Sequence, residues 1–66
     1  MEYNHAKRIA HDAVEAEQHE LIQAAHVLRT AEEDQTTSER RRQEAARHIS
    51  YIVFEVQMRL PETVAA

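Results

Sequence analysis

The amino-acid sequence predicts an all-α protein. Glycine is absent, Pro61 is the only proline, and alanine, glutamate, glutamine, arginine and leucine are frequent. Most of these residues favour helices, and a chain with so few helix breakers has few positions where a helix must end. Apolar residues also recur at steps of three and four, which is the spacing of one helix face. We therefore predict an antiparallel two-helix hairpin.

The first predicted helix spans residues 4–33. One polar residue, Glu17, lies inside its apolar stripe, where an apolar side chain is expected. Two interpretations of Glu17 remain open, a polar residue that sets the helix register or a long side chain that reaches water from the edge of a bundle. The stripe consists of Ala6, Ile9, Ala10, Ala13, Val14, Leu21, Ala24, Ala25, Leu28 and Ala31.

The second predicted helix spans residues 38–60 and follows a turn. Residues 34–38 are weak helix formers, and Thr36 with Glu39 has the spacing of a capping box. Pro61 disfavours helical geometry at the residue before it, so the helix should end near Leu60. The inner stripe of this helix consists of Ala45, Ala46, Ile49, Ile52, Val53, Val56 and Leu60.

The domain organisation follows from these elements. Residues 1–60 are predicted to form one helical domain, and residues 61–66 a short C-terminal tail. One long helix in an antiparallel coiled coil is the alternative, because a single heptad phase crosses the turn. The hairpin is favoured because this phase has no apolar residue between Ala31 and Ala45. A strand over residues 51–58 would lack a second strand to pair with.

Both predicted helices have more apolar surface than one partner helix covers. The first helix would be about 45 Å long and the second about 33 Å, so the start of the first stays uncovered. On the second helix, one apolar row lies opposite the inner stripe. A homodimer in which two hairpins form a four-helix bundle would bury both surfaces. The residues expected at this dimer or partner interface are Ala6, Ile9, Ala10, Ala13, Ile22, Tyr51, Phe54 and Met58.

Composition excludes several classes of protein. Twelve acidic and eight basic residues give a net charge of −4, which predicts no general attraction to nucleic acid or to anionic membranes. Cysteine is absent, so neither disulfides nor thiolate metal sites can form. No apolar run approaches the roughly 20 residues of a membrane span, and the N-terminus lacks a signal-peptide pattern. We expect a cytoplasmic protein.

The sequence indicates a binding function without chemistry. Ser38 and Ser50 have no recognisable arrangement of histidine and carboxylate around them, and a glycine-free chain cannot form a glycine-rich phosphate loop. We therefore predict neither an enzyme nor a cofactor. In length and expected architecture the chain resembles small helical hairpins that act as plasmid copy-control bundles, co-chaperones or inhibitors. The prediction is a protein-binding module that acts as adaptor, co-chaperone or inhibitor through helix–helix contacts.

The residue pattern contains two further groups of residues with binding chemistry, one basic and one of metal-ligand type. A nucleic-acid-binding helical bundle is the alternative function, and it would use the basic patch of Arg40, Arg41, Arg42 and Arg47. Glu39 and Glu44 interrupt this patch, so nucleic acid is not the preferred partner. Glu44 and His48 lie one helical turn apart and would be the pair for a metal ion, but two ligands from one helix do not complete a site. We expect no metal.

Overall fold

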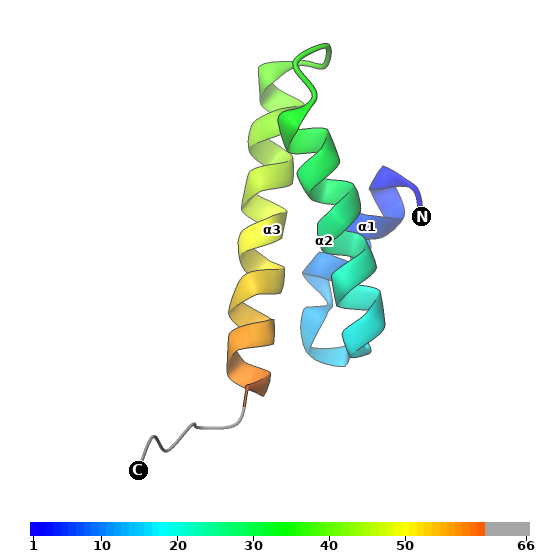
Figure 1. Ribbon diagram of the computed structural model, residues 1–66, viewed down its shortest axis with the longest axis vertical. Coiled ribbons are helices and arrows are strands. Elements are labelled where there is room, and N and C mark those ends of the chain that lie inside the picture. The colour runs from blue at the N-terminus through cyan, green and yellow to red at the C-terminus, as the bar shows by residue number, and fades with distance from the viewer. Residues whose placement is uncertain (61–66) are drawn as a thin grey trace.

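The computed structural model describes residues 1–60, which form helices and the turns between them (Figure 1). This part of the chain contains no strand, so the all-α prediction is confirmed and a strand over residues 51–58 is wrong. The predicted tail, residues 61–66, lies outside the described residues. The elements are α1 (Tyr3–His11), the 3₁₀ helix η1 (Ala13–Glu15), α2 (Gln18–Glu33) and α3 (Glu39–Arg59).

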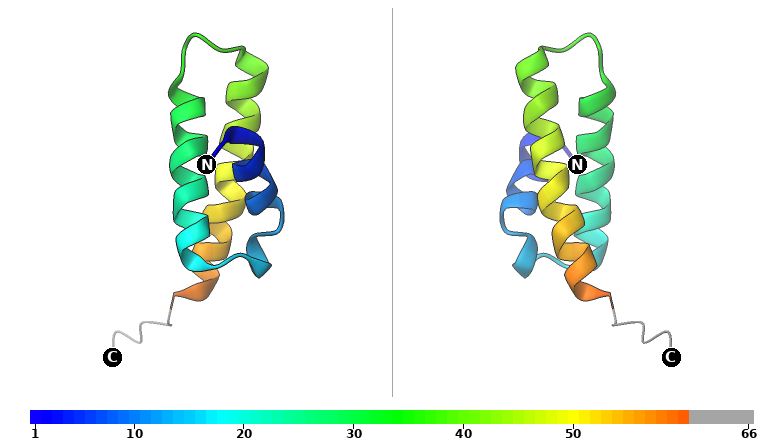
Figure 2. Two further views of the ribbon diagram at one scale, coloured as in Figure 1. Left: turned by 90° about the vertical axis from the view of Figure 1, so that its right-hand side faces the viewer. Right: turned by 90° about the vertical axis from the view of Figure 1, so that its left-hand side faces the viewer.

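Three helices pack together instead of the predicted two. α2 and α3 run antiparallel, side by side, and α1 folds back to lie against one side of this pair (Figures 1 and 2). A turn over residues 34–38 separates α2 from α3, so the alternative of one continuous helix is wrong. The second predicted helix agrees with α3 to within one residue at each end.

The prediction of one helix over residues 4–33 is wrong. α1 ends at His11, and a segment containing η1 reverses the chain before α2 begins at Gln18. A straight helix would expose the apolar face of its first turns, whereas the break brings that face against α2 and α3. In a chain of 66 residues this burial is a large part of the available core.

The reversal is built without glycine. No described residue has a positive φ. The chain reverses through two residues in extended conformations, Ala16 at φ −80° and Glu17 at φ −78°. Glu17 is the N-cap of α2, and its N–H donates to Oε1 of Glu20 at 2.9 Å. Glu17 therefore lies at a helix start instead of inside a continuous stripe, and its side chain is exposed to water.

The side chain of Arg59 holds the reversed segment against the end of α3. Its Nη2 donates to the carbonyl oxygens of Ala13 at 2.9 Å and Ala16 at 2.6 Å. Glu55, one turn earlier on α3, accepts from Arg59 Nε at 2.8 Å. Interrupting a helix leaves backbone carbonyls without their usual partners, and a guanidinium with several donors satisfies more than one of them.

The core lies where the three helices meet. α1 contributes mainly alanine, which lets its backbone approach the other helices closely, while α2 supplies the two largest fully buried side chains, Leu21 and Leu28. α3 contributes Ala45 and Ile52 to the same cluster. The buried apolar residues are Ala6, Ile9, Ala10, Ala13, Leu21, Ala24, Leu28, Ala45 and Ile52.

The start of α3 is capped by Ser38 rather than by Thr36. Ser38 is extended at φ −70°, and its Oγ accepts the N–H of Arg41 at 3.1 Å. Thr36 instead donates its N–H to Oδ1 of Asp34 at 2.9 Å, within the turn. The Thr36 hydroxyl donates to the same oxygen, and these two bonds, the hydroxyl bond first, lower the pKa of the Asp34 carboxyl because they stabilise its ionised form.

Candidate protein-interaction surfaces

The structure distributes the residues predicted for an interface over three places. Four of them, Ala6, Ile9, Ala10 and Ala13, are buried in the core of their own chain, so the uncovered helix start that motivated their selection does not exist. Ile22 lies on α2, where it faces a groove shared with α3. The other three, Tyr51, Phe54 and Met58, are exposed on α3.

One surface is the groove between α2 and α3 on the side away from α1, here called the α2–α3 groove. Ile22 and Val53 form its edges and expose 60% and 46% of their surface. Its cavity of about 260 Å³ contains a single polar side chain, that of Gln57. The lining residues are Leu21, Ile22, Ala25, Ile52, Val53, Val56 and Gln57.

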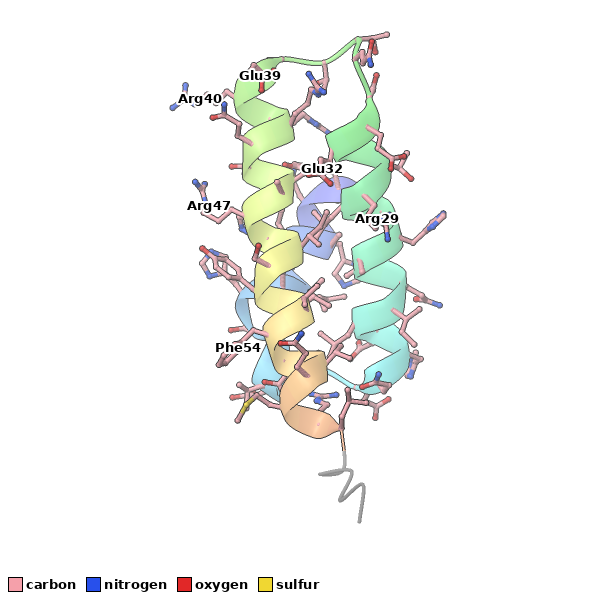
Figure 3. The ribbon with its side chains drawn as sticks, turned by 60° about the vertical axis from the view of Figure 1, so that its left-hand side comes forward. Arg29, Glu32, Glu39, Arg40, Arg47 and Phe54 are labelled. Atoms are coloured by element: carbon pink, nitrogen blue, oxygen red, sulfur yellow. The ribbon has the colours of Figure 1, made fainter. Side chains whose placement is uncertain are left out.

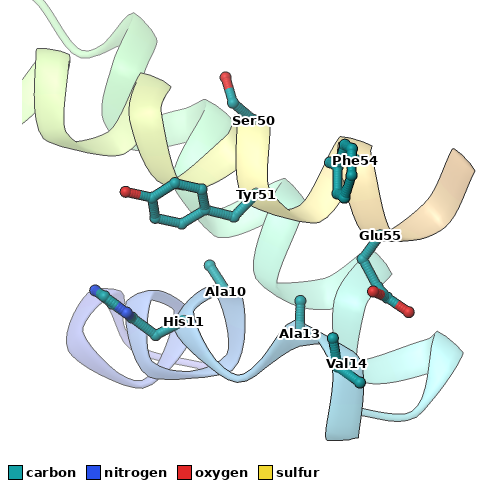
Figure 4. A pocket seen from close by; sticks show the side chains of 8 residues that line it. All are labelled: Ala10, His11, Ala13, Val14, Ser50, Tyr51, Phe54 and Glu55. Carbon is teal, nitrogen blue, oxygen red and sulfur yellow. The ribbon is translucent and has the colours of Figure 1, made fainter. Parts of the chain in front are cut away.

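A second surface lies where α3 meets the reversed segment, and we call Val14, Tyr51, Phe54 and Met58 the α3–η1 face. Val14, Phe54 and Met58 expose 78%, 65% and 69% of their surface. Below them Ala10 and Ala13 border a groove of about 360 Å³. Figure 4 shows Tyr51 and Phe54 on α3, across this groove from the side chain of Val14.

Three aromatic rings form a cluster beside the same groove, which two of them, His11 and Tyr51, also line. The ring centroid of His48 lies 5.1 Å from that of His11 and 5.2 Å from that of Tyr51, each in an edge-to-face arrangement. His48 is buried, and its Nδ1 lies 2.8 Å from the carbonyl oxygen of Glu44. These contacts join α1 to α3 and give His48 a role in packing.

Polar contacts join the start of α1 to α3. The Tyr3 hydroxyl donates to Oε1 of Glu44 at 2.8 Å, and Nζ of Lys7 lies 3.0 Å from the same oxygen. Burial and the bond to Glu44 raise the pKa of Tyr3 to about 12. The hydrogen bonds from Tyr3 and Lys7 lower the pKa of Glu44, because both stabilise its carboxylate.

The predicted basic patch is divided between two environments. The guanidinium of Arg41 lies 3.9 Å from the ring centroid of Tyr3, and Arg42 donates from Nε to the carbonyl oxygen of Glu32 at 3.0 Å and from Nη1 to Glu39 at 3.1 Å. These two arginines therefore contact their own chain.

Arg40 and Arg47 are exposed and make no ion pair with another residue of the described part. Figure 3 shows Arg40, Arg47 and Phe54 on the same outward side of α3. The basic patch is therefore reduced to a short row that runs toward the α3–η1 face.

The pair proposed for a metal ion is engaged in other contacts. The Glu44 carboxylate accepts from Tyr3 and Lys7, and Nδ1 of His48 faces a backbone carbonyl. Within residues 1–60, no three histidine, aspartate or glutamate side chains converge as metal ligands would. A helix with the length and apolar character of a membrane span is likewise missing from this range.

Sequence reasoning missed three exposed apolar residues: Val14 and Val53, which lie on these surfaces, and Leu60 at the end of α3. All three were assigned to inner stripes, because their helical phase matches that of buried neighbours. Val14 is exposed because the chain leaves helical geometry just before it, which the heptad phase cannot reveal. Val53 is exposed because α1 packs on the other side of the α2–α3 pair and leaves the side that contains Val53 uncovered.

Comparisons of the chain with protein-family models, with curated proteins and with solved structures find no match.

Proposed function

We propose that this protein is a small binding module that receives an amphipathic helix of another protein in the α2–α3 groove. It would act as adaptor, co-chaperone or inhibitor, in the cytoplasm and without chemistry of its own. The observation that supports this proposal is the open apolar groove between Ile22 on α2 and Val53 on α3. Contiguous apolar surface on a small protein commonly marks a site of interaction.

The position of α1 indicates what such a groove accepts. On one side of the α2–α3 pair, α1 and η1 pack with small and branched residues at steps of three and four, namely Ala6, Ile9 and Ala10 of α1 and Ala13 of η1. The opposite side of the same pair has an apolar floor formed by Leu21, Ala25 and Ile52 and no helix of the described residues over it. A partner helix with the same spacing of small and apolar residues would fit there.

The apolar lining of the groove would favour an apolar partner surface over a charged one. Gln57 is the one polar residue that lines it, and neither edge contains a charged side chain among the lining residues. Burying a charge there without a partner would be unfavourable, so a helix with a continuous apolar stripe is preferred over a highly charged one. Ile22 and Val53 would contribute most of the newly buried apolar area, since they are the exposed branched residues of the groove.

Affinity capture with immobilised variants tests this proposal. Wild-type protein, Ile22→Asp and the neighbouring exposed control Gln23→Asp are each used to capture proteins from the source cells, and captured proteins are then purified and titrated. We expect a protein that binds the wild type and Gln23→Asp, with affinity at least about 10-fold lower for Ile22→Asp. Equal binding to all three variants would contradict a site in the groove.

A nucleic-acid-binding bundle remains the alternative function, and exposed Arg40 and Arg47 are the observation that favours it. Phosphate contacts make affinity fall steeply as the salt concentration rises. Titration of duplex DNA and of RNA at two salt concentrations, with wild type and with Arg40→Gln/Arg47→Gln, separates the two functions. Salt-dependent binding that the double variant loses would support this alternative.

A further inference from the structure

We infer that two copies of this chain exchange their α1 helices and form a dimer in which residues 3–33 of each copy are one continuous helix. α1 of each copy then lies on the α2–α3 pair of the other, in the place that it occupies on its own chain in the monomer. The α2–α3 groove, on the opposite side of the pair, stays open in this dimer. The exchange is therefore independent of the partner binding proposed above.

The segment between α1 and α2, residues 12–17, has the composition of a helix, and we call it the hinge. Its sequence is Asp-Ala-Val-Glu-Ala-Glu, in which four of the six residues are alanine or glutamate. Both are strong helix formers. The chain contains no glycine, its one proline is far from the hinge, and no described residue has a positive φ. A helix could therefore pass through the hinge, and tertiary contacts are what interrupt it in the monomer.

Val14 has the helical phase of the core but lies outside it. It exposes 78% of its surface, whereas Leu21 and Leu28, at successive steps of seven residues, are fully buried. Seven residues are close to two turns, so in a continuous helix Val14 would lie on the same face as these leucines. The exchanged dimer covers that face, because the two continuous helices meet where their hinges cross. An exposed valine of the monomer then becomes a contact between copies.

Arg59 maintains the reversal through carbonyl groups that a helix would satisfy by itself. In the monomer, the carbonyl oxygens of Ala13 and Ala16 accept from Nη2 of Arg59 at 2.9 and 2.6 Å. In a continuous helix, the same oxygens accept from backbone N–H groups four residues later. Neither form leaves these carbonyls without a donor. The bonds of Arg59 therefore stabilise the monomer specifically, and the exchanged form does not need them.

A two-fold axis through the hinge reproduces the packing of the monomer. In the monomer α1 is antiparallel to α2, because the chain reverses between them (Figure 2). In the straightened chain both segments run in one direction, and a perpendicular two-fold axis reverses the second copy. α1 of one copy is again antiparallel to α2 of the other. Positions equally far before and after the hinge lie side by side in both forms, so the register is kept as well.

The contacts between α1 and α3 would pass from within a chain to between chains. The Tyr3 hydroxyl and Nζ of Lys7 contact Oε1 of Glu44 at 2.8 and 3.0 Å. The rings of His11 and His48 lie 5.1 Å apart. The dimer repeats each of these contacts and adds those of the hinge. Association costs translational and rotational freedom, so the monomer is favoured at low concentration and mass action favours the dimer as concentration rises.

Refolding from urea over a series of protein concentrations tests the exchange, since α1 must leave its own chain before it joins another. We expect a dimer in wild-type protein refolded at millimolar concentration and only monomer at micromolar concentration, as measured by sedimentation velocity. Glu17→Pro suits the monomer, where residue 17 has φ −78° and follows an extended Ala16, but it interrupts a continuous helix. The dimer dissociation constant of Glu17→Pro should be at least about 100-fold higher than that of the wild type.

Glu39→Pro is the matched control for Glu17→Pro. It also replaces an exposed glutamate by proline at the start of a helix, and the residue before it, Ser38, is extended. The exchange leaves the turn between α2 and α3 unchanged. The dissociation constant of this control should therefore stay within about 3-fold of the wild-type value. Circular dichroism establishes that both proline variants are helical.

Arg59→Met should promote the dimer. It removes the donors to the Ala13 and Ala16 carbonyls, which only the monomer uses. A hydrogen bond to a charged group is worth roughly tenfold or more in an equilibrium constant, and the monomer loses it in both chains, so the dissociation constant should fall about 100-fold. Arg47→Met replaces an exposed arginine elsewhere on α3 and should leave the dissociation constant unchanged.

Carbodiimide cross-linking distinguishes the exchange from any other dimer. The reagent joins an amine directly to a carboxylate, and Lys7 is the only lysine of the chain. Its Nζ lies 3.0 Å from Oε1 of Glu44. In the monomer this link stays within one chain, whereas in the exchanged dimer it joins two chains and gives a covalent dimer on a denaturing gel. Mass spectrometry of the digested band identifies the linked pair, which Glu44→Gln should lose.

Three results would overturn this inference. The first is that neither the wild type nor Arg59→Met dimerises after refolding at millimolar concentration. The second is that Glu17→Pro dimerises as well as Glu39→Pro. The third is a dimer in which the link between Lys7 and Glu44 stays within each chain. None of these results depends on whether another protein binds the α2–α3 groove.

Discussion

Arg59 and Ala16 are joined by a hydrogen bond of 2.6 Å, from the Arg59 guanidinium to the Ala16 carbonyl oxygen. The bond connects the last turn of α3 to the extended residue that follows η1 and precedes the N-cap of α2. The same guanidinium reaches the carbonyl of Ala13, and Glu55 holds it in place. A single side chain therefore stabilises the reversal that makes this a three-helix protein.

Replacing Arg59 should destabilise the whole fold. Arg59→Met keeps much of the apolar stem but removes the donors to the Ala13 and Ala16 carbonyls, and it leaves Glu55 without its partner. Hydrogen bonds to charged groups contribute about 1.5–3 kcal/mol and are not additive, so we expect a loss of roughly 2–3 kcal/mol in the free energy of unfolding. Urea denaturation monitored by circular dichroism measures it. Arg47→Met is the control, and an equal loss in both variants would contradict the role of Arg59.

Glu17 should be improvable as a helix cap. Serine is a better N-cap residue than glutamate, because its short side chain reaches the free N–H groups of the first turn. Glu17→Ser is therefore expected to raise the free energy of unfolding by about 0.5–1 kcal/mol. Glu17→Leu should lower it, since leucine cannot cap. If Glu17→Leu were the more stable variant, Glu17 would belong to an apolar stripe and not to a helix start.

The helical class and the course of α3 could be predicted from local signals. Weak helix formers mark the turn at residues 34–38, and Pro61 limits the helix on the other side. These signals depend on residues close together in the chain, which is why they are readable without a structure. Thr36 was nevertheless assigned as the cap in place of Ser38, because side chains within the turn compete for the same N–H groups.

The break at residues 12–17 could not be predicted in the same way. No glycine or proline marks it, and the heptad phase of Val14 and Leu21 continues across it. The break is favoured by long-range interactions, namely the packing of Ala6 and Ala10 on the other helices and the bonds from Arg59. Tertiary contacts of this kind override local helix propensity.

The candidate surfaces were likewise predictable only where they depend on one helix alone. Tyr51, Phe54 and Met58 share a helical phase opposite Ile52, so their position away from the core followed from α3 alone. Ile22 was grouped with them, yet it faces a different groove. Which grooves stay open depends on where α1 packs, and that was the part the sequence did not reveal.

Raising the pH above 10 should remove the stabilisation that the Tyr3 hydroxyl provides. The pKa of Tyr3 is about 12 in the folded protein and 10.0 ordinarily, so the fold favours the protonated phenol. The resulting stabilisation is fully present below pH 10 and is lost as the pH rises from 10 to 12. Wild type should thus be more stable than Tyr3→Phe at pH 8, and this difference should shrink by pH 11.5.

Urea unfolding of both proteins at each pH measures this difference, and ultraviolet titration of the phenolate gives the pKa directly. Tyr51→Phe allows the Tyr3 signal to be read alone, because the chain has two tyrosines. A Tyr3 signal that titrates near pH 10, or a stability difference that does not change with pH, would contradict the bond to Glu44.

Enlarging Ala6 should destabilise the monomer itself. Ala6 is fully buried between α1 and its neighbours, so Ala6→Leu forces extra methylene groups into a filled core. Overpacking typically costs about 1–3 kcal/mol. The loss, measured by thermal unfolding, should be the same at low and high protein concentration. A loss seen only where the protein self-associates would place Ala6 at an interface between copies.

The central claim is that α1 packs on α3 of its own chain and so leaves the α2–α3 groove open. Two NOESY experiments together test it most directly: a ¹³C-edited NOESY on labelled protein, which detects contacts within a molecule, and an isotope-filtered NOESY on a mixture of labelled and unlabelled protein, which detects contacts between molecules. We predict contacts between the Tyr3 ring and the Arg41 side chain, whose guanidinium lies 3.9 Å from the ring centroid, within a single molecule. Contacts that appear only between labelled and unlabelled molecules, or no contacts at all, would contradict the claim.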